Sequence, residues 1–303
     1  MRRLLGGAGV VFLLLALPLQ ASAHSERTAA NPPNNDAAQV PAHRNINPAD
    51  PNVLVVCKPN SGAIIDSWPE AWHNFKAKDH ALLARCGFDN LQAAVDAVPH
   101  SGTTIAIMPG TYLEEATTDT STWSQHCKDL LVQVASNPAI SYADQLACPH
   151  VTQEVAILGD PDSVSKGLTD GDGKYDCDGR LCNLQVEGMG RDPTEVVFDN
   201  KFQRLNAIRA DRANGVYFRN FTTQHTEFNG MYVIETDGYV FDSILSRWDL
   251  EYGFLSFTVD HGLYVNCETY GNGDSGIYPG GQAQRYGYRP SVEVKNCSTH
   301  HNT

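Results

Sequence analysis

Short apolar segments recur at a near-constant interval in the C-terminal part of the chain. The segments GMYVIETD, GFLSFTVD and GIYPG begin at Gly230, Gly253 and Gly276, so both steps are 23 residues. A second series, VYFRN, YVFDS, LYVNC and VEVKN, begins at Val216, Tyr239, Leu263 and Val292. Two short strands in each period, bounded by Gly, Asn and Asp turns, are typical of a β-solenoid.

Apolar and polar positions alternate within the second series, as they do in strands with one buried face. When the four segments are aligned at their first residues, one inward column holds Val216, Tyr239, Leu263 and Val292, and the next holds Phe218, Phe241, Val265 and Val294. The column between them is mixed, which suits an outer face. Parallel crossovers are almost always right-handed. The pattern therefore predicts an all-β fold, a right-handed parallel β-helix.

The N-terminal part of the domain predicts a cap for this helix. Asp89 can begin a short helix whose Leu91, Ala94, Val95 and Val98 share one face. A strand over Thr104–Met108 and a turn at Pro109-Gly110 follow, so the helix can cover the open first coil. Residues 115–150 lack the repeat and are predicted to be an insertion that is helical around 127–136.

The two ends of the chain carry different signals. Residues 1–23 combine charged Arg2 and Arg3, an apolar stretch and a small-residue site at Ala21-Ser22-Ala23, which predicts a secretory signal peptide. Residues 24–52 predict a flexible linker, and 53–303 the β-helix domain. The chain stops at Thr303 in mid-repeat, so we expect further coils beyond it.

Composition narrows the possible partners. The 303 residues include 22 Lys and Arg against 35 Asp and Glu, a net charge of −13, with 42% hydrophobic residues. No basic run is present, which argues against a nucleic-acid partner. The apolar stretch near the N-terminus is too short for a membrane span. We expect a secreted (extracellular or periplasmic) monomer.

Eight cysteines follow the predicted signal peptide, and an even number in an exported chain indicates disulfides. Proximity in the sequence favours Cys57–Cys86, Cys127–Cys148 and Cys177–Cys182. These three pairings leave Cys267 and Cys297 as the fourth pair.

The segments NLQAAVDAVP and IAIMPGTYLEE, at residues 90–99 and 105–115, resemble the entry to the pectin-lyase-like superfamily of right-handed parallel β-helix proteins. The likeness covers roughly residues 86–303 and extends to secreted proteins with right-handed β-helix (PbH1) repeats. It implies an extracellular protein that binds or acts on polysaccharide. GTYLE at Gly110–Glu114 is similar to the first pectin methylesterase motif. Later motifs of that family, and the Asp-Pro-His signature of mannuronan epimerases, are missing from the sequence, so the resemblance implies no single activity.

The turn after the second strand series gathers Arg, Asp, His and Trp. In the register aligned by eye, Arg247 lies beside Gly271 and His300, and Trp248 beside Asn272. We expect a groove whose candidate catalytic residues are Arg247, Asp249, Asp274 and His300. Candidate sugar-binding residues are Trp248, Tyr252, Tyr270 and His225.

Two kinds of chemistry fit such a groove. In a lyase, Arg247 or His300 would remove the proton beside a uronate carboxylate. In a glycoside hydrolase, two of Asp249, Glu251 and Asp274 would share the acid and base or nucleophile roles. An epimerase is a further possibility, and so is a polar outer turn with ordinary ion pairs. The sequence thus predicts a polysaccharide-binding and potentially carbohydrate-active β-helix, with a non-catalytic adhesive solenoid as the alternative.

The segment TDGDGKYDCDGRLC, at residues 169–182, is a candidate metal site. Asp170, Asp172, Asp176 and Asp178 supply clustered oxygen ligands suited to Ca²⁺. Their spacing does not match an EF-hand. A Gly- and Asp-rich loop closed by Cys177–Cys182 is the simpler interpretation.

Overall fold

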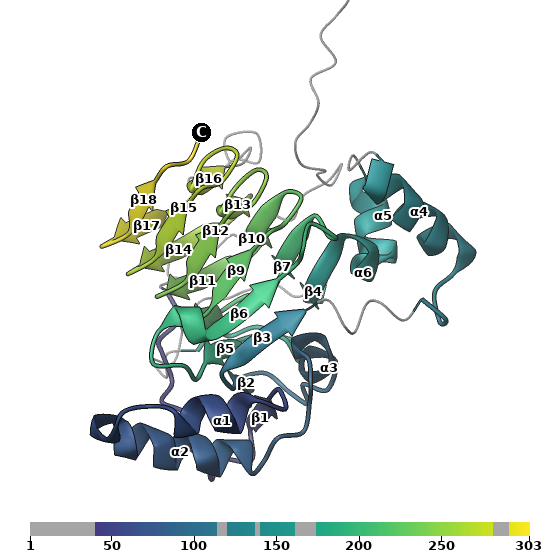
Figure 1. The fold of residues 1–303 in the computed structure, drawn as a ribbon. Coiled ribbons are helices and arrows are strands. Elements are labelled where there is room, and N and C mark those ends of the chain that lie inside the picture. The colour runs from purple at the N-terminus through teal and green to yellow at the C-terminus, as the bar shows by residue number, and fades with distance from the viewer. Residues whose placement is uncertain (1–39, 114–119, 137–139, 161–173, 281–290) are drawn as a thin grey trace, which may run out of the picture.

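The chain winds into a parallel β-helix built from three sheets (Figure 1). The computed structural model describes residues 40–113, 120–136, 140–160, 174–280 and 291–303. The expected signal peptide and the expected calcium ligands Asp170 and Asp172 lie outside these ranges. All pairings between neighbouring strands are parallel, so the fold class that the repeat predicts is confirmed.

From β2 onwards, successive strands belong in turn to sheets A, B and C, and β1 adds one more strand to the start of sheet A. Sheet A has the order β1 (Val53–Val56), β2 (Thr104–Ile107), β5 (Gln185–Gly188), β8 (Val216–Arg219), β11 (Asp237–Asp242), β14 (Asp260–Val265) and β17 (Val292–Lys295). Sheet B has β3 (Gly110–Leu113), β6 (Val196–Asp199), β9 (Thr222–Gln224), β12 (Leu245–Arg247), β15 (Glu268–Tyr270) and β18 (Ser298–His300). Sheet C has β4 (Gln153–Leu158), β7 (Asn206–Asp211), β10 (Asn229–Ile234), β13 (Phe254–Phe257) and β16 (Ile277–Gly280).

The core is a continuous column of apolar side chains enclosed by the three sheets. Phe218, Phe241 and Phe254 are fully buried, and their rings pack edge to face. Edge-to-face aromatic pairs add to the free energy gained by burial alone. The predicted inward positions of Phe218 and Phe241 are thus confirmed.

The register differs from the sequence alignment by one residue in the coil of β14. Tyr239 pairs with Gly262, not with Leu263, and Phe241 pairs with Tyr264, not with Val265. Since side chains alternate with period two, this shift places Leu263 and Val265 on the outer face. The sequence pattern pairs apolar residues with one another and therefore does not place Gly262 in the inward column.

Position 262 is a glycine because the ring of Tyr239 occupies the space that a side chain would need there. A Cβ added at Gly262 would lie 2.2 Å from Cζ of Tyr239. The hydroxyl of Tyr239 donates to Ser256 Oγ at 3.0 Å and lies 3.4 Å from the hydroxyl of Tyr264. Tyr264 also donates to Ser256 Oγ at 2.8 Å. The core therefore accepts two tyrosines because their hydroxyl groups find partners.

Helix α3 (Leu91–Asp96) packs across the N-terminal end of the core, as predicted. Leu91, Ala94 and Val95 are buried against the first coils. The residue that caps the helix is Asn90, not Asp89, because Asn90 Oδ1 accepts from the backbone N–H of Ala93 at 2.8 Å. The cap prevents other chains from pairing with the open end of the core.

A second apolar cluster lies outside sheet A, beneath α1 (Ser61–Asp66) and α2 (His73–Leu83), which the 3-10 helix η1 (Glu70–Trp72) joins (Figure 1). Ile65, Trp68 and Leu82 are buried there with Val53 and Met108. These helices have no counterpart in the sequence prediction, and they bury the outward side chains of the first two strands of sheet A.

Residues 40–52, which the sequence analysis places in a flexible linker, are packed against the domain. Ile46 is buried in the cluster outside sheet A. The backbone N–H of Arg44 donates to Gln185 Oε1 at 2.9 Å, and Gln185 Nε2 donates to the carbonyl of Arg44 at 2.8 Å. His43 Nε2 lies 2.9 Å from Glu187 Oε2. Side chains on the outer face of sheet A thus bind residues 40–52, which their composition had predicted to lie in solvent.

The predicted insertion is helical and lies beside sheet C. It comprises α4 (Gln125–Ser136), α5 (Tyr142–Ala147) and α6 (Pro149–Thr152), and α4 covers the predicted 127–136. Its apolar cluster includes Leu130, Val151 and Leu205. The short 3-10 helix η2 (Pro193–Glu195) precedes β6.

Three disulfides join the pairs that sequence proximity favours, Cys57–Cys86, Cys127–Cys148 and Cys177–Cys182. The fourth expected pair is not bonded, since Cys267 and Cys297 are free thiols. They lie in neighbouring coils, where the N–H of Ser298 donates to the carbonyl of Cys267 at 2.9 Å. None of the helices within the described ranges has the length and apolar character needed to cross a membrane.

We expect Gly262→Ala to destabilise the protein, because the new methyl group would displace the buried ring of Tyr239. Overpacking of this kind costs about 1–3 kcal/mol of the free energy of unfolding. Urea unfolding followed by fluorescence would measure it. Gly87→Ala is the matched control, since the nearest atom to its new Cβ would be 3.9 Å away. Equal stability of the two variants would contradict the register described for β14.

A second prediction concerns the pH dependence of the protein's stability, which Asp79 affects. It is fully buried on α2, neither carboxylate oxygen has a hydrogen-bond partner within the described residues, and burial raises its pKa to about 7. Nearby Glu195 and Glu187 raise the pKa further, and Lys78 opposes them. The pKa of Asp79 in the folded protein lies above the ordinary value of 3.8, so the contribution of Asp79 to stability is fully present below about pH 4. This contribution is lost as pH rises through 7.

Asp79→Asn removes the charge and should remove this pH dependence. At pH 8 we expect the variant to be more stable than the wild type by about 1–3 kcal/mol, since no buried carboxylate then has to ionise. Urea midpoints measured at pH 5 and pH 8 test this, with exposed Glu70→Gln as the control. A wild type whose stability does not fall between these pH values would overturn the prediction.

Candidate functional site

The strands of sheet B end in a line of polar and aromatic side chains, one from each coil. These last residues of β6, β9, β12, β15 and β18 pair in register and are Asp199, Gln224, Arg247, Tyr270 and His300. We call this line, together with Phe202, His225, Trp248, Gly271 and His301 of the turns that follow it, the outer ladder. Its position at the strand ends follows directly from the parallel stacking of the coils.

The turn that follows adds a second line of side chains. His225, Trp248, Gly271 and His301 all have a positive φ, between 53° and 69°, in this turn. Phe202, with a φ of 56°, continues the line in the preceding coil, where its N–H donates to the carbonyl of His225. Left-handed backbone is uncommon outside glycine, so the repeated conformation marks a fixed bend in the chain.

The register of this turn also differs by one residue from the sequence alignment. Arg247 pairs with Tyr270, not with Gly271, so Trp248 lies beside Gly271. A Cβ at Gly271 would lie 2.7 Å from Cδ1 of Trp248, and only glycine leaves room for the indole ring. Tyr270 thereby moves into the same line as Arg247.

Aromatic contacts connect the coils along the outer ladder. The ring of His225 stacks on that of Trp248, with centroids 5.4 Å apart and planes inclined by 14°. The ring of Phe202 is tilted against that of His225, with centroids 5.1 Å apart. Tyr270 stacks on His300 at 5.3 Å and meets Trp248 edge to face at 5.8 Å. Trp248 and Phe202 are each 42% exposed, which is unusual for large rings that belong to an ordered cluster.

Arg247 lies at the centre of the outer ladder. Its Nε donates to Gln224 Oε1 at 2.9 Å, and Nη1 donates to the hydroxyl of Tyr270 at 3.0 Å. Its Cζ lies over the Trp248 ring, 4.3 Å from the centroid, a cation–π contact. No carboxylate of the described residues lies within ion-pair distance of Arg247. Among those residues, three of the five guanidinium N–H groups therefore have no acceptor and the charge has no counterion.

Below Arg247, Asp199 is the acceptor for two neighbouring side chains. Gln224 Nε2 donates to Asp199 Oδ2 at 3.0 Å, and His225 Nδ1 lies 2.9 Å from Asp199 Oδ1. Burial tends to raise the pKa of Asp199, but hydrogen bonds from His225 and Gln224 outweigh it, and the net pKa is lowered. Asp199 is thus ionised at neutral pH.

His300 and His301 continue the ladder in the last coil. Nδ1 of His300 lies 2.7 Å from Nδ1 of His301, and its Nε2 lies 3.1 Å from Glu268 Oε1. Both ring nitrogens of His300 therefore have partners within the protein. His225 differs in that its Nε2 has no partner among the described residues.

Asp249 does not face this surface. It is 1% exposed, and its carboxylate accepts from the N–H of Thr226 at 3.1 Å and from the hydroxyl groups of Thr226 and Ser246 at 2.8 and 2.7 Å. Its own N–H donates to Asn272 Oδ1, one coil on, at 3.0 Å. Burial raises the pKa of Asp249 to about 8 despite these bonds. The structure places this residue inside the turn, where it links neighbouring coils.

Asp274 and Tyr252 lie further along the same turn, away from the line of Arg247. The N–H of Asp274 donates to the carbonyl of Glu251, so the two acidic residues are neighbours in adjacent coils. Burial, and then the charge of Asp274, raise the pKa of Glu251 to about 7. Tyr252 is buried in an apolar cluster with Tyr232 and stacks on Tyr278 at 4.9 Å.

The expected groove is thus divided in two. Arg247, Trp248, Tyr270, His300 and His225 come together on the outer ladder, whereas Asp249, Asp274 and Tyr252 do not join them. Sequence reasoning missed Asp199, Gln224 and Phe202 as members of the site. Asp199 lies 25 residues before Gln224, so a search at the 23-residue period passes over it.

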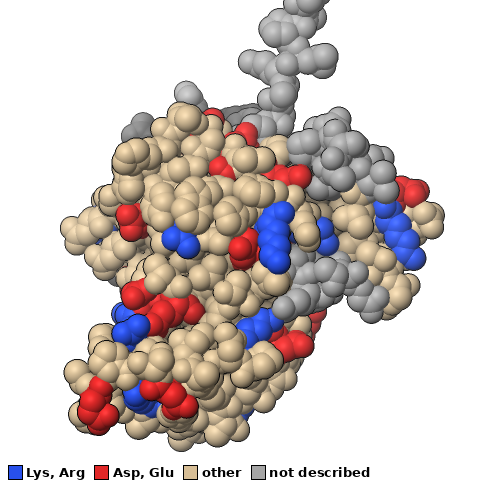
Figure 2. All heavy atoms as spheres, viewed as in Figure 1, with Lys and Arg blue, Asp and Glu red and all other residues tan. Residues whose placement is uncertain are grey.

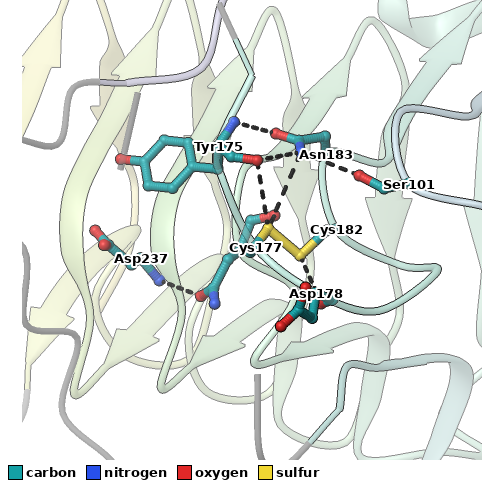
Figure 3. The surroundings of a disulfide bond; sticks show 8 residues. Ser101, Tyr175, Cys177, Asp178, Cys182, Asn183 and Asp237 are labelled. Carbon is teal, nitrogen blue, oxygen red and sulfur yellow. Dashed lines mark hydrogen bonds between the residues drawn. A yellow bond between two sulfur atoms is a disulfide. The ribbon is translucent and has the colours of Figure 1, made fainter. Parts of the chain in front are cut away.

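The Asp-rich loop is only partly described. Asp176 and Asp178 flank Cys177 in the sequence, and Cys177 forms a disulfide with Cys182. Figure 3 shows Asp178 beside this disulfide. Asn183 fastens the start of the segment, since its side chain accepts from the N–H of Tyr175 and donates to the carbonyl of Tyr175 and to Ser101 Oγ. Within the described residues no three His, Cys, Asp or Glu side chains are grouped to hold a metal ion. Asp170 and Asp172 lie outside those residues, so calcium binding by this loop stays a prediction.

Comparison with known proteins adds little at the level of function. No protein-family model matches the sequence, and no curated protein matches it. The chain is similar to a solved structure titled "Rhamnogalacturonan lyase", with 13% identity and a TM-score of 0.37, over 72% of this chain and 53% of that one. This chain thus spans about half the length of that protein. A likeness of this size carries no functional argument, and the fold is established by the three parallel sheets.

Asp249→Ala tests whether this residue holds the turn together. The variant leaves the buried N–H and hydroxyl of Thr226 without their acceptor, so we expect a loss of about 1–3 kcal/mol in the free energy of unfolding. Denaturant unfolding measures the loss. Asp274→Ala, in the next coil and half-buried, should cost less than about 1 kcal/mol. An Asp249→Ala protein as stable as the wild type would contradict the role in the turn.

Proposed function

We propose that the protein binds an acidic extracellular polysaccharide along the outer ladder. The observation that carries the proposal is the guanidinium of Arg247, whose partners among the described residues are all neutral groups. Gln224 and Tyr270 fix its orientation through hydrogen bonds, and Trp248 supports it from one face. A cation fixed in this way has N–H donors left for a ligand, and a carboxylate matches them in a bidentate pair.

The surroundings of Arg247 suit a sugar polymer. The outer ladder extends over the coils of β6 to β18, so it offers a linear binding surface rather than a closed pocket. Exposed edges of Trp248 and Phe202 supply apolar contact, while Tyr270 and the histidines supply polar contact. Charged side chains are scattered thinly over this face of the molecule, and most of its surface is uncharged (Figure 2).

Local contact must dominate this binding, because the whole chain carries a net charge of −13. That charge repels a polyanion at long range. In physiological salt, however, charges more than about 8 Å apart are largely screened. We therefore expect modest affinity for each site, reinforced when a polymer presents many identical acidic groups.

The three disulfides fit an extracellular protein. The resemblance to the pectin-lyase-like superfamily fits polysaccharide as a ligand.

Arg247→Ala should weaken binding to polygalacturonate by about 10- to 100-fold, because hydrogen bonds to a charged group contribute about 1.5–3 kcal/mol. Affinity electrophoresis and calorimetry measure the change, with the neutral polymer dextran as the comparison ligand. Trp248→Ala removes the support of the guanidinium and should weaken binding less strongly.

Leu250→Ala is the matched control, since Leu250 is 60% exposed and lies two residues from Trp248 outside the ladder. Its affinity should stay within about twofold of the wild type. Equal affinity for polygalacturonate and dextran, or an Arg247→Ala protein that binds as the wild type does, would refute the proposed function.

A further inference from the structure

We propose that a cavity in the helical insertion binds a small uncharged aromatic compound that carries a hydroxyl or N–H group. The cavity has a volume of about 240 Å³. Trp123, Cys127 and residues 147–151 line it, together with Thr122 and Ser124. None of these residues belongs to the outer ladder. Binding at this cavity therefore goes beyond the proposed function and does not depend on it.

Three short helices supply the walls of this cavity (Figure 1). Trp123 lies just before α4, and Cys127 lies in the first turn of α4. Ala147 ends α5, and residues 149–151 form most of α6. The disulfide from Cys127 to Cys148 joins α4 to the junction of α5 and α6. Because this cross-link lies in the wall itself, it limits how far α4 and α6 can separate.

Most of the wall is apolar, and it encloses the space of a ring. Val151 is 1% and Cys148 is 4% exposed, so they form the floor, whereas Thr122 and Ala147 are exposed and lie at the rim. An apolar cavity of about 150 Å³ is large enough to hold benzene. A volume of about 240 Å³ therefore admits one substituted ring or two fused rings. A flat ring would restore the dispersion contacts that the unfilled wall lacks.

Trp123 supplies an aromatic wall with a polar edge. The residue packs against the apolar cluster that contains Leu130 and Val151, so the protein itself fixes the position of the indole. Its ring nitrogen is accessible and has no acceptor among the described residues. An indole in this position offers a face for stacking and an N–H donor for a ligand.

His150 adds a second polar group. Its Nδ1 is buried and its Nε2 is accessible, and neither nitrogen has a hydrogen-bond partner within the described ranges. Burial lowers the pKa of His150; the charge of Asp96 opposes this effect and that of Arg204 adds to it. The imidazole is therefore neutral at pH 7, and its Nε2 can donate or accept one hydrogen bond.

The charge of the wall selects the class of ligand. None of the residues that line the cavity is Asp, Glu, Lys or Arg, and His150 is neutral. A carboxylate or ammonium group would lose its hydration here without gaining a counterion, which is costly. An uncharged ring with one polar group pairs that group with His150 or Trp123 and buries the rest. Phenol, p-cresol and indole have this chemistry and size.

Titration of the purified protein with p-cresol, followed by ligand-detected NMR and calorimetry, tests the site. We expect a dissociation constant of about 1 mM or below, the range of a well-fitted single ring. Toluene lacks the hydroxyl group and leaves the polar edge of the cavity unpaired, so it should bind about three- to tenfold more weakly. The carboxylate of p-toluate should weaken binding by about tenfold or more.

Two substitutions separate polar recognition from shape. His150→Phe keeps a flat ring but removes both nitrogens, so affinity for p-cresol should fall about three- to tenfold while affinity for toluene should not fall. Ala147→Phe places a ring in the cavity and should abolish binding of both compounds. Ala147 is exposed, so its replacement should leave the melting temperature nearly unchanged. His73→Phe, at an exposed position of α2, is the matched control and should bind p-cresol as the wild type does.

Loss of p-cresol binding in Ala147→Phe, with unchanged binding in His73→Phe, would support the site. If the wild type binds none of these ring compounds up to their solubility limits, the cavity is not a ligand site. Equal affinity for p-cresol and p-toluate, or for p-cresol and toluene, would overturn the class of ligand inferred from the wall. Binding of p-cresol that survives both His150→Phe and Ala147→Phe would overturn its location. None of these results alters the test of polygalacturonate binding at Arg247.

Discussion

Parallel pairing of each strand with its counterpart one coil further on is the constraint on which the rest of this structure depends. Because the pairing is in register, each side chain lies against the residue at the same position of the next coil. Inside, this stacks Phe218, Phe241 and Tyr264 into one aromatic column. The glycines at 262 and 271 occur where a neighbouring ring, of Tyr239 or Trp248, occupies the space of a side chain. Side-chain packing and strand register therefore determine each other in this fold.

The same stacking gives the surface its chemistry. Side chains that are far apart in the sequence, such as Asp199, Gln224 and Arg247, become hydrogen-bonded neighbours because each ends a strand of sheet B. The arginine is then held by neutral groups, and the histidine by a carboxylate. A site of this kind needs no pocket, because the regular spacing of the coils matches a linear polymer better than a cavity does.

Buried acidic groups show that position, not residue type, decides the role of a carboxylate here. Asp199 has a lowered pKa because hydrogen bonds stabilise its charge. Asp249 is bonded as well, yet complete burial raises its pKa to about 8. Asp79 is buried with no hydrogen-bond partner for its carboxylate among the described residues, and burial raises its pKa to about 7. Three aspartates of one chain thus orient an imidazole, fasten a turn and destabilise a helix contact.

The sequence by itself determined the coil period, the inward positions of Phe218 and Phe241, the capping helix, the helical insertion and three disulfides, since these follow from local spacing and alternation. It also identified Arg247, Trp248, Tyr270, His300 and His225 as members of one surface. Only the tertiary structure decided the one-residue register of β14 and β15, the inward position of Asp249, the packing of residues 40–52 and the part played by Asp199. Each of these depends on which side chain has room beside a residue of another coil, and apolar spacing along one strand does not contain that information.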